Sequence, residues 1–193
     1  MSTVIMANVV SVDGFIADDN DQPGPLFDWY FSGDTPLTAE GFGKVSAASA
    51  AYIRPIWESV GAMVIGRRLF DMTNGWEGNP PVGGHVVVVS HRPKPEGWHP
   101  EASYHFVDDV TKAVAKAKEL AAGGTVSVAA GEVGGQALEL GLVDEVAMDV
   151  VPVVFGSGKR YFGSVGNAQL LLEDAHTVVQ GDRVLHLLYK VRR

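Results

Sequence analysis

The stretch at residues 125–158, TVSVAAGEVGGQALELGLVDEVAMDVVPVVFGSG, decides the fold of this chain. Its first apolar run, residues 126–130, is typical of a short buried strand. A glycine-rich turn at 131–135 follows, and then a short helix over residues 136–140. The second apolar run, residues 145–155, returns to the sheet. The stretch therefore predicts a strand, a turn, a helix and a second strand.

Such a turn offers an anion site, because the unpaired N–H groups and the dipole of a helix start attract phosphate. The residues concerned are Gly131, Glu132, Val133, Gly134, Gly135 and Gln136. The turn lacks the G-x-G-x-x-G fingerprint, and residues 156–160 are not a P-loop, since Arg160 replaces the required Ser or Thr. A turn with a purely structural role remains the alternative.

Composition indicates a globular protein. The 193 residues are 46% hydrophobic and 20% charged, which suits one α/β domain with a substantial core. The net charge of −8 disfavours a general nucleic-acid or anionic-membrane binder. The absence of cysteine excludes disulfides, thiolate metal sites and a cysteine nucleophile. The start, MSTVIMANVV, lacks the features of a signal peptide, so we expect a cytoplasmic protein without membrane spans.

Strand and helix patterns alternate along most of the chain. We expect strands at 3–12, 15–17, 62–66, 85–90 and 103–107, and helices at 46–60, from 67 onward and at 109–120. Pro55 should kink or divide the first helix. A terminal hairpin is expected from 169–179 and 183–191. This order predicts a mainly parallel sheet with helices on both faces and an antiparallel C-terminal edge.

The segment at residues 18–43 reads as a long excursion of the kind that forms lids, binding loops or partner surfaces. It carries an aromatic cluster that includes Trp29 and Tyr30, which could cover the core, a dimer partner or a flat substrate ring. Asn8 lies inside the first apolar run. It is either a hydrogen-bonded core amide or a polar group that faces a ligand.

Polar residues follow three predicted strands at the same edge of the sheet. They are Gly66-Arg67-Arg68, Ser90-His91-Arg92 and the glycine turn at 131–136. Arginine forks bind phosphate bidentately, so they suit the 2′-phosphate of NADP, while the helix start suits its pyrophosphate. No acidic residue is placed to bind a free 2′-hydroxyl, so NADPH is preferred over NADH. Solvated surface charges are the alternative for the arginines.

Four motifs resemble one known family. They are SVDGFIA at 11–17, VIGRR at 64–68, the glycine turn at 131–136, and GLVDE at 141–145 followed by Pro152 and GSG at 156–158. The chain is similar to the dihydrofolate reductase-like proteins, specifically the group with the reductase domain of the bifunctional riboflavin-biosynthesis deaminase-reductase. The resemblance covers nearly the whole chain apart from residues 18–43.

This resemblance implies a single three-layer α/β domain over residues 1–193, with an insertion at 18–43, and an NADPH-dependent reductase that forms a homodimer. Val9 and Ile16 would line the nicotinamide pocket. Gly66, Arg67 and Arg68 would meet the phosphates, Ser90 and Arg92 the adenosine end, and residues 131–136 the pyrophosphate. The substrate would be a small heterocycle, either 5-amino-6-(5-phosphoribosylamino)uracil or a pterin-like compound. Independently of the resemblance, Asn8, Trp29 and Trp57 are the candidate substrate contacts.

The sequence departs from the family in its proton donor. Dihydrofolate reductases carry a buried carboxylate in the helix before the G-R strand, whereas the helix here begins SAASAA at 46–51. The acids available instead are Asp13, Asp28 and Asp149. Burial of Asp149 in its apolar strand could raise its pKa and keep it a proton donor, whereas Asp13 is more simply a turn residue. Folate is therefore doubtful as the substrate.

Two other functions remain open. The fold could bind a nucleotide without catalysis, as a sensor. A metal-dependent hydrolase is the weaker option, because the six histidines show no H-x-x-x-H or H-E-x-x-H spacing, and we expect no metal. His105 and His186 are expected on strand faces. Without cysteine the zinc deaminase signature is absent, so the chain corresponds at most to the reductase half.

Overall fold

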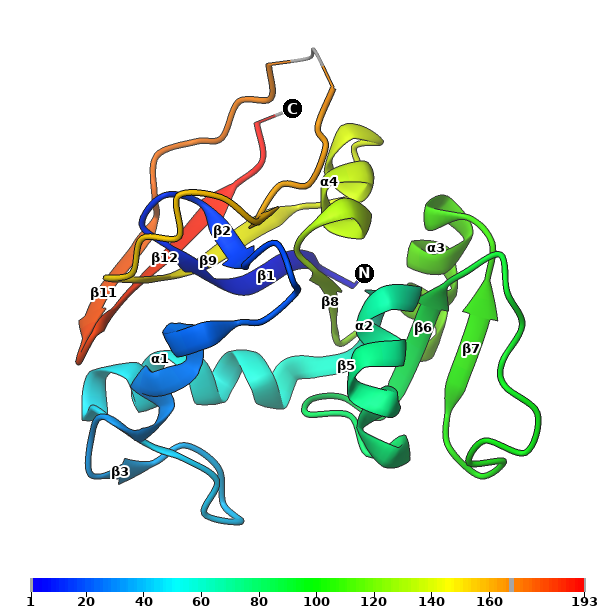
Figure 1. Cartoon of the computed structure of the whole chain (residues 1–193), viewed down its shortest axis with the longest axis horizontal. Coiled ribbons are helices and arrows are strands. Elements are labelled where there is room, and N and C mark those ends of the chain that lie inside the picture. Colours follow the sequence, from blue (N-terminus) through cyan, green and yellow to red (C-terminus); the bar gives the residue numbers. More distant parts are fainter. Residues whose placement is uncertain (1, 167–168, 193) are drawn as a thin grey trace.

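The computed structural model describes residues 2–166 and 169–192, and it is built around one twisted eight-stranded sheet (Figure 1). The strand order is β11-β12-β9-β1-β8-β5-β6-β7. The six strands from β9 to β7 in this order are mutually parallel, and β12 and β11 are antiparallel additions. The predicted sheet is confirmed. Its strands are β1 Val4–Ser11, β5 Val60–Gly66, β6 His85–Val89, β7 Tyr104–Val107, β8 Thr125–Ala129, β9 Glu145–Val151, β11 Thr177–Gly181 and β12 Val184–Lys190.

Helices cover both faces of the sheet, which gives the predicted three layers (Figure 1). One face carries α1 (Ala47–Ser59) and α2 (Arg67–Thr73), and the other carries α3 (Val110–Leu120) and α4 (Glu132–Glu139). Side-chain alternation along β5 shows the arrangement: Ile65 packs with Phe70 of α2, whereas Val64 packs with Val114 of α3. A strand buried on both faces reads as a continuous apolar run, which is why these segments are so rich in valine.

The segment at 18–43 completes the core beneath α1. It contains the 3-10 helix η1 (Gly24–Phe31), whose Leu26 and Trp29 are fully buried beside Val9 of β1. Trp29 is 1% exposed, so the core interpretation of this tryptophan is confirmed. The remaining short elements are β2 Phe15–Ala17, β3 Thr35–Pro36, β4 Lys44–Val45, η2 Asn74–Gly78 and β10 Lys159–Arg160.

Several predicted boundaries are wrong. Helix α4 begins at Glu132, so the expected glycine turn is its first turn and only Gly131 has a positive φ, of 98°. Helix α1 is not divided at Pro55. Strand β9 ends at Val151, and β11 begins at Thr177 rather than at 169. Of the expected strand at 169–179, the earlier part forms only an isolated bridge between Leu172 and Val191.

The carboxyl edge of the sheet has a step. Strand β8 ends level with Ala7, and Gly66, Val89 and Val107 of the next three strands are aligned in register. Strands β1 and β9, in contrast, continue to Ser11 and Val151. The last residues of β1 and β9 therefore extend past the end of β8 and lie beside the segment that follows it. Within the described ranges, none of the helices combines the length and hydropathy that a membrane crossing requires.

Candidate functional site

Four residues predicted at the cofactor converge where α4 begins. A Cβ atom added to Gly131 would lie 3.2 Å from Cδ1 of Ile16, and one added to Gly66 would lie 3.2 Å from Cγ2 of Val133. These contacts bring the ends of β5, β8 and the short strand β2 together. Gly131 must be glycine, because its φ of 98° is strained for any other residue.

The first turn of α4 presents backbone donors at this point. The first intrahelical bond runs from the Gly135 N–H to the Gly131 carbonyl at 2.8 Å, so the N–H groups of Glu132, Val133 and Gly134 precede it. The N–H of Gly131 itself donates to the Tyr161 carbonyl at 2.7 Å. The turn therefore suits an anion, with the donors coming from the helix backbone.

Gly134 and Gly135 serve packing. A Cβ atom on Gly134 would lie 2.7 Å from the Ala129 carbonyl oxygen, and one on Gly135 would collide with the Phe162 carbonyl oxygen. Both residues are buried, so they allow α4 to approach β8 and the 161–163 segment closely. Gly135 N–H is used within the helix, so of these two glycines Gly134 is the one whose N–H remains among the first-turn donors. Gln136 is exposed on the next turn of α4.

Arg67 and Arg92 are held together by one carboxylate. Nε of Arg67 lies 2.7 Å from Oδ1 of Asp71, and Nη2 of Arg92 lies 2.7 Å from Oδ2 of the same carboxylate. Hydrogen bonds from Arg67 and Arg92 hold the pKa of Asp71 below its ordinary value. Arg67 Nη1 also donates to Ser90 Oγ at 3.4 Å and to the Pro93 carbonyl at 3.0 Å. Two positive charges and one negative charge thus leave this cluster with a net positive charge.

Arg68 lies apart from that cluster. It forms an ion pair with Asp21, and its side chain is 70% exposed. Asp21 belongs to the 18–43 segment, so this segment reaches the phosphate side of the predicted cofactor site. The sequence placed the three arginines in one group, and the structure divides them into a pair and a single residue.

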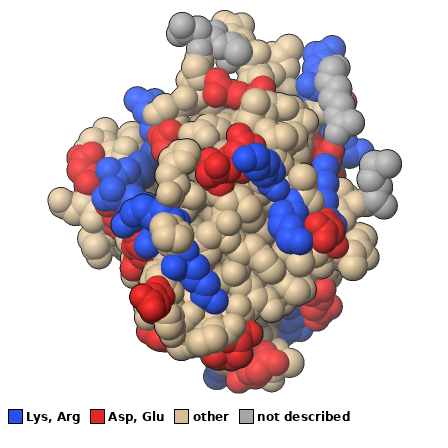
Figure 2. Space-filling view, turned by 90° about the vertical axis from the view of Figure 1, so that its right-hand side faces the viewer, with Lys and Arg blue, Asp and Glu red and all other residues tan. Residues whose placement is uncertain are grey.

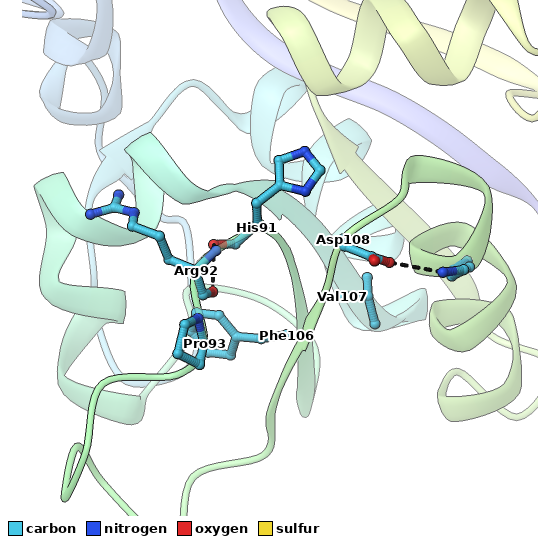
Figure 3. Close-up of a pocket in the computed structure, with 8 residues that line it drawn as sticks. His91, Arg92, Pro93, Phe106, Val107 and Asp108 are labelled. Carbon is cyan, nitrogen blue, oxygen red and sulfur yellow. Dashed lines mark hydrogen bonds and ion pairs between the residues drawn. The ribbon is translucent and has the colours of Figure 1, made fainter.

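A hollow of about 390 Å³ lies beyond the carboxyl ends of β6 and β7 (Figure 3). It is lined by Ser90, His91, Arg92, Pro93, Phe106, Val107, Asp108 and Lys112. Lys112 pairs with Asp108 at 2.9 Å, and the Arg92 side chain points away from Asp108. Figure 2 views this side of the molecule, where basic and acidic side chains are interspersed. The hollow therefore suits a small anionic group rather than a long polyanion.

Asp13 is a structural carboxylate. It accepts hydrogen bonds from Ser11 Oγ at 2.6 Å, from the Gly156 N–H at 2.7 Å and from the Phe155 N–H at 3.1 Å. These bonds, that of Ser11 foremost, hold its pKa below the ordinary value. A carboxylate stabilised in its ionised form is a poor proton donor, so Asp13 is corrected to a residue that ties the β1–β2 turn to residues 155–156.

Asp149 is paired with a histidine that the sequence analysis placed only on a strand face. His186 of β12 is its register partner, and Nδ1 of His186 lies 2.6 Å from Oδ1 of Asp149. His186 Nε2 lies 2.9 Å from Oγ of Ser49, on α1. The expected lone buried acid is therefore corrected to one end of a hydrogen-bonded chain. Both residues interrupt apolar strands, which was the available signal, but the strand register that joins them was not predictable.

The predicted substrate contacts do not form one group. Of them, Trp29 contacts this chain, whereas Asn8 precedes Val9 on β1, so its side chain lies on the opposite face of the sheet. Trp29 packs edge-on against His186 with ring centroids 5.2 Å apart. Trp57 is half-buried and packs against Tyr30. Asn8 is half-buried, and its Oδ1 accepts from the Val9 N–H at 2.8 Å. Among the residues that the structure describes, no group of three or more His, Asp or Glu side chains could hold a metal ion.

Fold and site together describe a three-layer α/β domain with arginine side chains and helix-start N–H groups along one edge of its sheet. The chain belongs to the RibD C-terminal domain family, whose model matches residues 2–186. The fold is the dihydrofolate reductase-like one that RibD reductase domains share. No curated protein matches the chain in sequence.

Solved structures show the same fold at low sequence identity. A candidate riboflavin biosynthesis protein of Shewanella sp. PV-4 is 20% identical, with a TM-score of 0.70 over 100% of both chains. A pyrimidine reductase-like protein of Corynebacterium diphtheriae is 15% identical, with a TM-score of 0.59 over 100% of this chain and 92% of that one. The deaminase and 5-amino-6-(5-phosphoribosylamino)uracil reductase of Thermotoga maritima is 13% identical, with a TM-score of 0.61, and this chain spans 57% of it.

Proposed function

We propose that this protein is an NADPH-dependent reductase of a small heterocyclic substrate. The observation that carries the proposal is the alignment of three anion-binding features along one sheet edge: the hollow after β6, the Arg67–Asp71–Arg92 cluster after β5 and the start of α4 after β8. Membership of the RibD C-terminal domain family supports a reductase.

The order of the strands gives the cofactor a direction. The adenosine end with its 2′-phosphate would occupy the hollow, beside Ser90 and Arg92. The pyrophosphate would meet the first-turn N–H groups of α4, with Gly66, Arg67 and Arg68 alongside. The distance from β6 to β1 across the sheet is three strand spacings, roughly 14 Å. The nicotinamide end therefore falls beside Ile16 and Val9, where β1 and β9 project past the end of β8.

The bound cofactor would supply a hydride. The residues of this chain would hold the acceptor beside the nicotinamide and exclude water. Holding the two reacting groups in line raises the rate of hydride transfer. The substrate would lie beside β1 and β9, against the half-buried aromatic side chains Tyr30 and Trp57. A planar nitrogen heterocycle suits these flat faces. The first candidate is 5-amino-6-(5-phosphoribosylamino)uracil, the substrate in the name of the Thermotoga maritima enzyme, and a pterin-like compound is the second.

The test is oxidation of NADPH by the purified protein in the presence of each candidate acceptor, with the reduced product identified by mass spectrometry. Turnover that requires the acceptor supports the proposal. NADPH binding without oxidation by either acceptor would instead favour a non-catalytic nucleotide-binding protein. Arg92→Ala should raise the KM for NADPH, and the matched variant Arg192→Ala at the far end of the sheet should not.

The resemblance to reductase domains also supports a homodimer located in the cytoplasm. Light scattering of the purified protein at micromolar concentration tests the dimer. A monomeric mass at all concentrations would contradict it.

A further inference from the structure

A chain of four hydrogen-bonded side chains runs from the start of α1 to the carboxyl end of β9. Ser46 Oγ lies 3.1 Å from Ser49 Oγ, Ser49 Oγ lies 2.9 Å from His186 Nε2, and His186 Nδ1 lies 2.6 Å from Asp149 Oδ1. Ser49 and His186 are both 0% exposed. The two ends are not sealed, since Ser46 is half-buried and the Asp149 side chain is 16% exposed.

The fold holds this chain in place from several elements. Asp149 and His186 are opposite each other in the β9–β12 ladder, and Ser49 faces them from α1. A Cβ atom on Gly181 would collide with Ser49 Oγ, so β11 passes closely over the chain. Two aromatic rings also enclose His186. The ring centroid of Trp29 lies 5.2 Å from that of His186, and the ring centroid of Tyr52 lies 4.9 Å from it.

The Asp149 end lies where the proposed reaction takes place. Asp149 is the register partner of Val9 on the neighbouring strand, so its side chain lies on the same face as the residue proposed to line the nicotinamide pocket. Only Oδ1 of Asp149 has a hydrogen bond to protein among the described residues. Nearby, Trp29 Nε1 and Tyr52 Oη are buried without a hydrogen-bond partner in the described part of the chain.

Such unpaired buried donors are costly unless a ligand satisfies them. A ring that carries a carbonyl oxygen would accept from Tyr52, and a nitrogen or oxygen on it would face Asp149. This chemistry matches an oxo-substituted heterocycle such as a uracil or a pterin.

We infer that Ser46, Ser49, His186 and Asp149 form a proton relay that delivers the proton of the reduction, an inference that rests on the proposed reductase function. Reduction of a C=N or C=O bond adds a hydride to carbon and a proton to nitrogen or oxygen. The cofactor supplies the hydride and becomes oxidised. Asp149 gives its proton to the heteroatom and is protonated again by His186. His186 takes a proton from Ser49, and Ser49 takes one from Ser46. Ser46 in turn takes a proton from water.

In this account Asp149 is the catalytic residue that touches the substrate, and His186 and Ser49 are positioning residues. The titratable groups that face the Asp149–His186 pair are Tyr30 of η1 and Tyr52 of α1, with Glu145 on β9 close to Tyr52. Tyr161 is buried on the opposite face of the sheet, where the charge of Asp149 still disfavours its ionised form. Burial, and after it the charge of Asp149, raises the pKa of Tyr30 and of Tyr52, so both phenols stay neutral. Neither phenol therefore competes with the Asp149–His186 pair as the proton donor.

The test measures protons without requiring turnover. NADP⁺ and NADPH are titrated into the protein by calorimetry in two buffers of different ionisation enthalpy, which counts the protons released on binding. Oxidised nicotinamide is cationic and reduced nicotinamide is neutral, so the relay predicts that binding of NADP⁺ releases more protons than binding of NADPH. His186→Gln should abolish this difference, and the matched control His105→Gln on β7 should retain it.

A second variant covers the case in which His186→Gln does not fold. Ser49→Ala removes the partner of His186 Nε2 and interrupts the chain from Ser46, so this variant should also reduce the difference. Equal proton counts for the two nucleotides, or a His186→Gln variant with the wild-type difference, would overturn the relay while leaving the reductase function standing. Failure of both nucleotides to bind would overturn the reductase function and the relay with it.

Discussion

Arg68 of α2 forms an ion pair with Asp21, 47 residues earlier in the chain. Asp21 is buried, and Lys159 Nζ also lies 3.9 Å from its Oδ1. The 18–43 segment is thereby attached both to the predicted phosphate side and, through Trp29, to the core beneath α1. A segment that looked like an insertion in the sequence thus joins the proposed cofactor and substrate sites.

The Asp21 carboxylate should compete with a phosphate for Arg68. We expect Asp21→Asn to tighten NADPH binding about 3-fold, because removal of a negative charge beside a phosphate-binding arginine lowers repulsion. Fluorescence titration of NADPH measures this. Asp34→Asn, at an exposed position of the same segment, is the control. Unchanged or weaker binding to Asp21→Asn would show that Arg68 does not contact the phosphates.

Arg92 should discriminate between the two nicotinamide dinucleotides. A hydrogen bond to a charged group contributes about 1.5–3 kcal/mol, so Arg92→Ala should raise the Kd for NADPH about 10-fold or more. The Kd for NADH should change less than about 3-fold, because NADH lacks the 2′-phosphate. Equal weakening of both nucleotides would contradict the assignment of the 2′-phosphate to this residue.

Gly135 should be needed for folding rather than for binding. An added Cβ would collide with the Phe162 carbonyl oxygen, so α4 would have to move, and overpacking of this kind costs about 1–3 kcal/mol. Gly84→Ala is the matched control, since nothing lies within 4 Å of its added Cβ. Urea unfolding gives both values. A Gly135→Ala variant as stable as Gly84→Ala would disprove the packing role.

Asp13 should make stability depend on pH in the acid range. Its folded-state pKa is lowered, chiefly by the Ser11 hydroxyl, so its contribution is fully present above the unfolded value of about 3.9. The contribution is lost as the pH falls through the folded pKa. Asp13→Asn should therefore melt below wild type at neutral pH, with the gap closing below about pH 4. A gap that stays constant across this range would contradict the prediction.

The sheet was predictable because each of its strands carries its own signal. Valine-rich runs such as residues 86–89 identify buried parallel strands, and Asp109 marks the start of α3 by capping it. The family motifs predicted that β5, β6 and β8 end at the same edge of the sheet. The strand register confirms that the carboxyl ends of these three strands are adjacent.

The start of α4 was not predictable, because its glycines have two unrelated causes. Gly131 is required because its backbone has a positive φ. Gly134 and Gly135 are required because β8 and residue 162 pass too close to α4 for a side chain. Only the folded structure distinguishes them. The same limit applies to the relay: the polar residues Asp149 and His186 were visible in apolar strands, but their pairing depends on the register between β9 and β12.

The most direct test of the central claim is a calorimetric titration of the wild-type protein with NADPH and, separately, with NADH. The three features proposed to bind anions at the carboxyl edge predict micromolar binding of NADPH and binding of NADH weaker by about 10-fold or more. Binding of neither nucleotide, or equal affinity for both, would contradict the cofactor site proposed for this edge of the sheet.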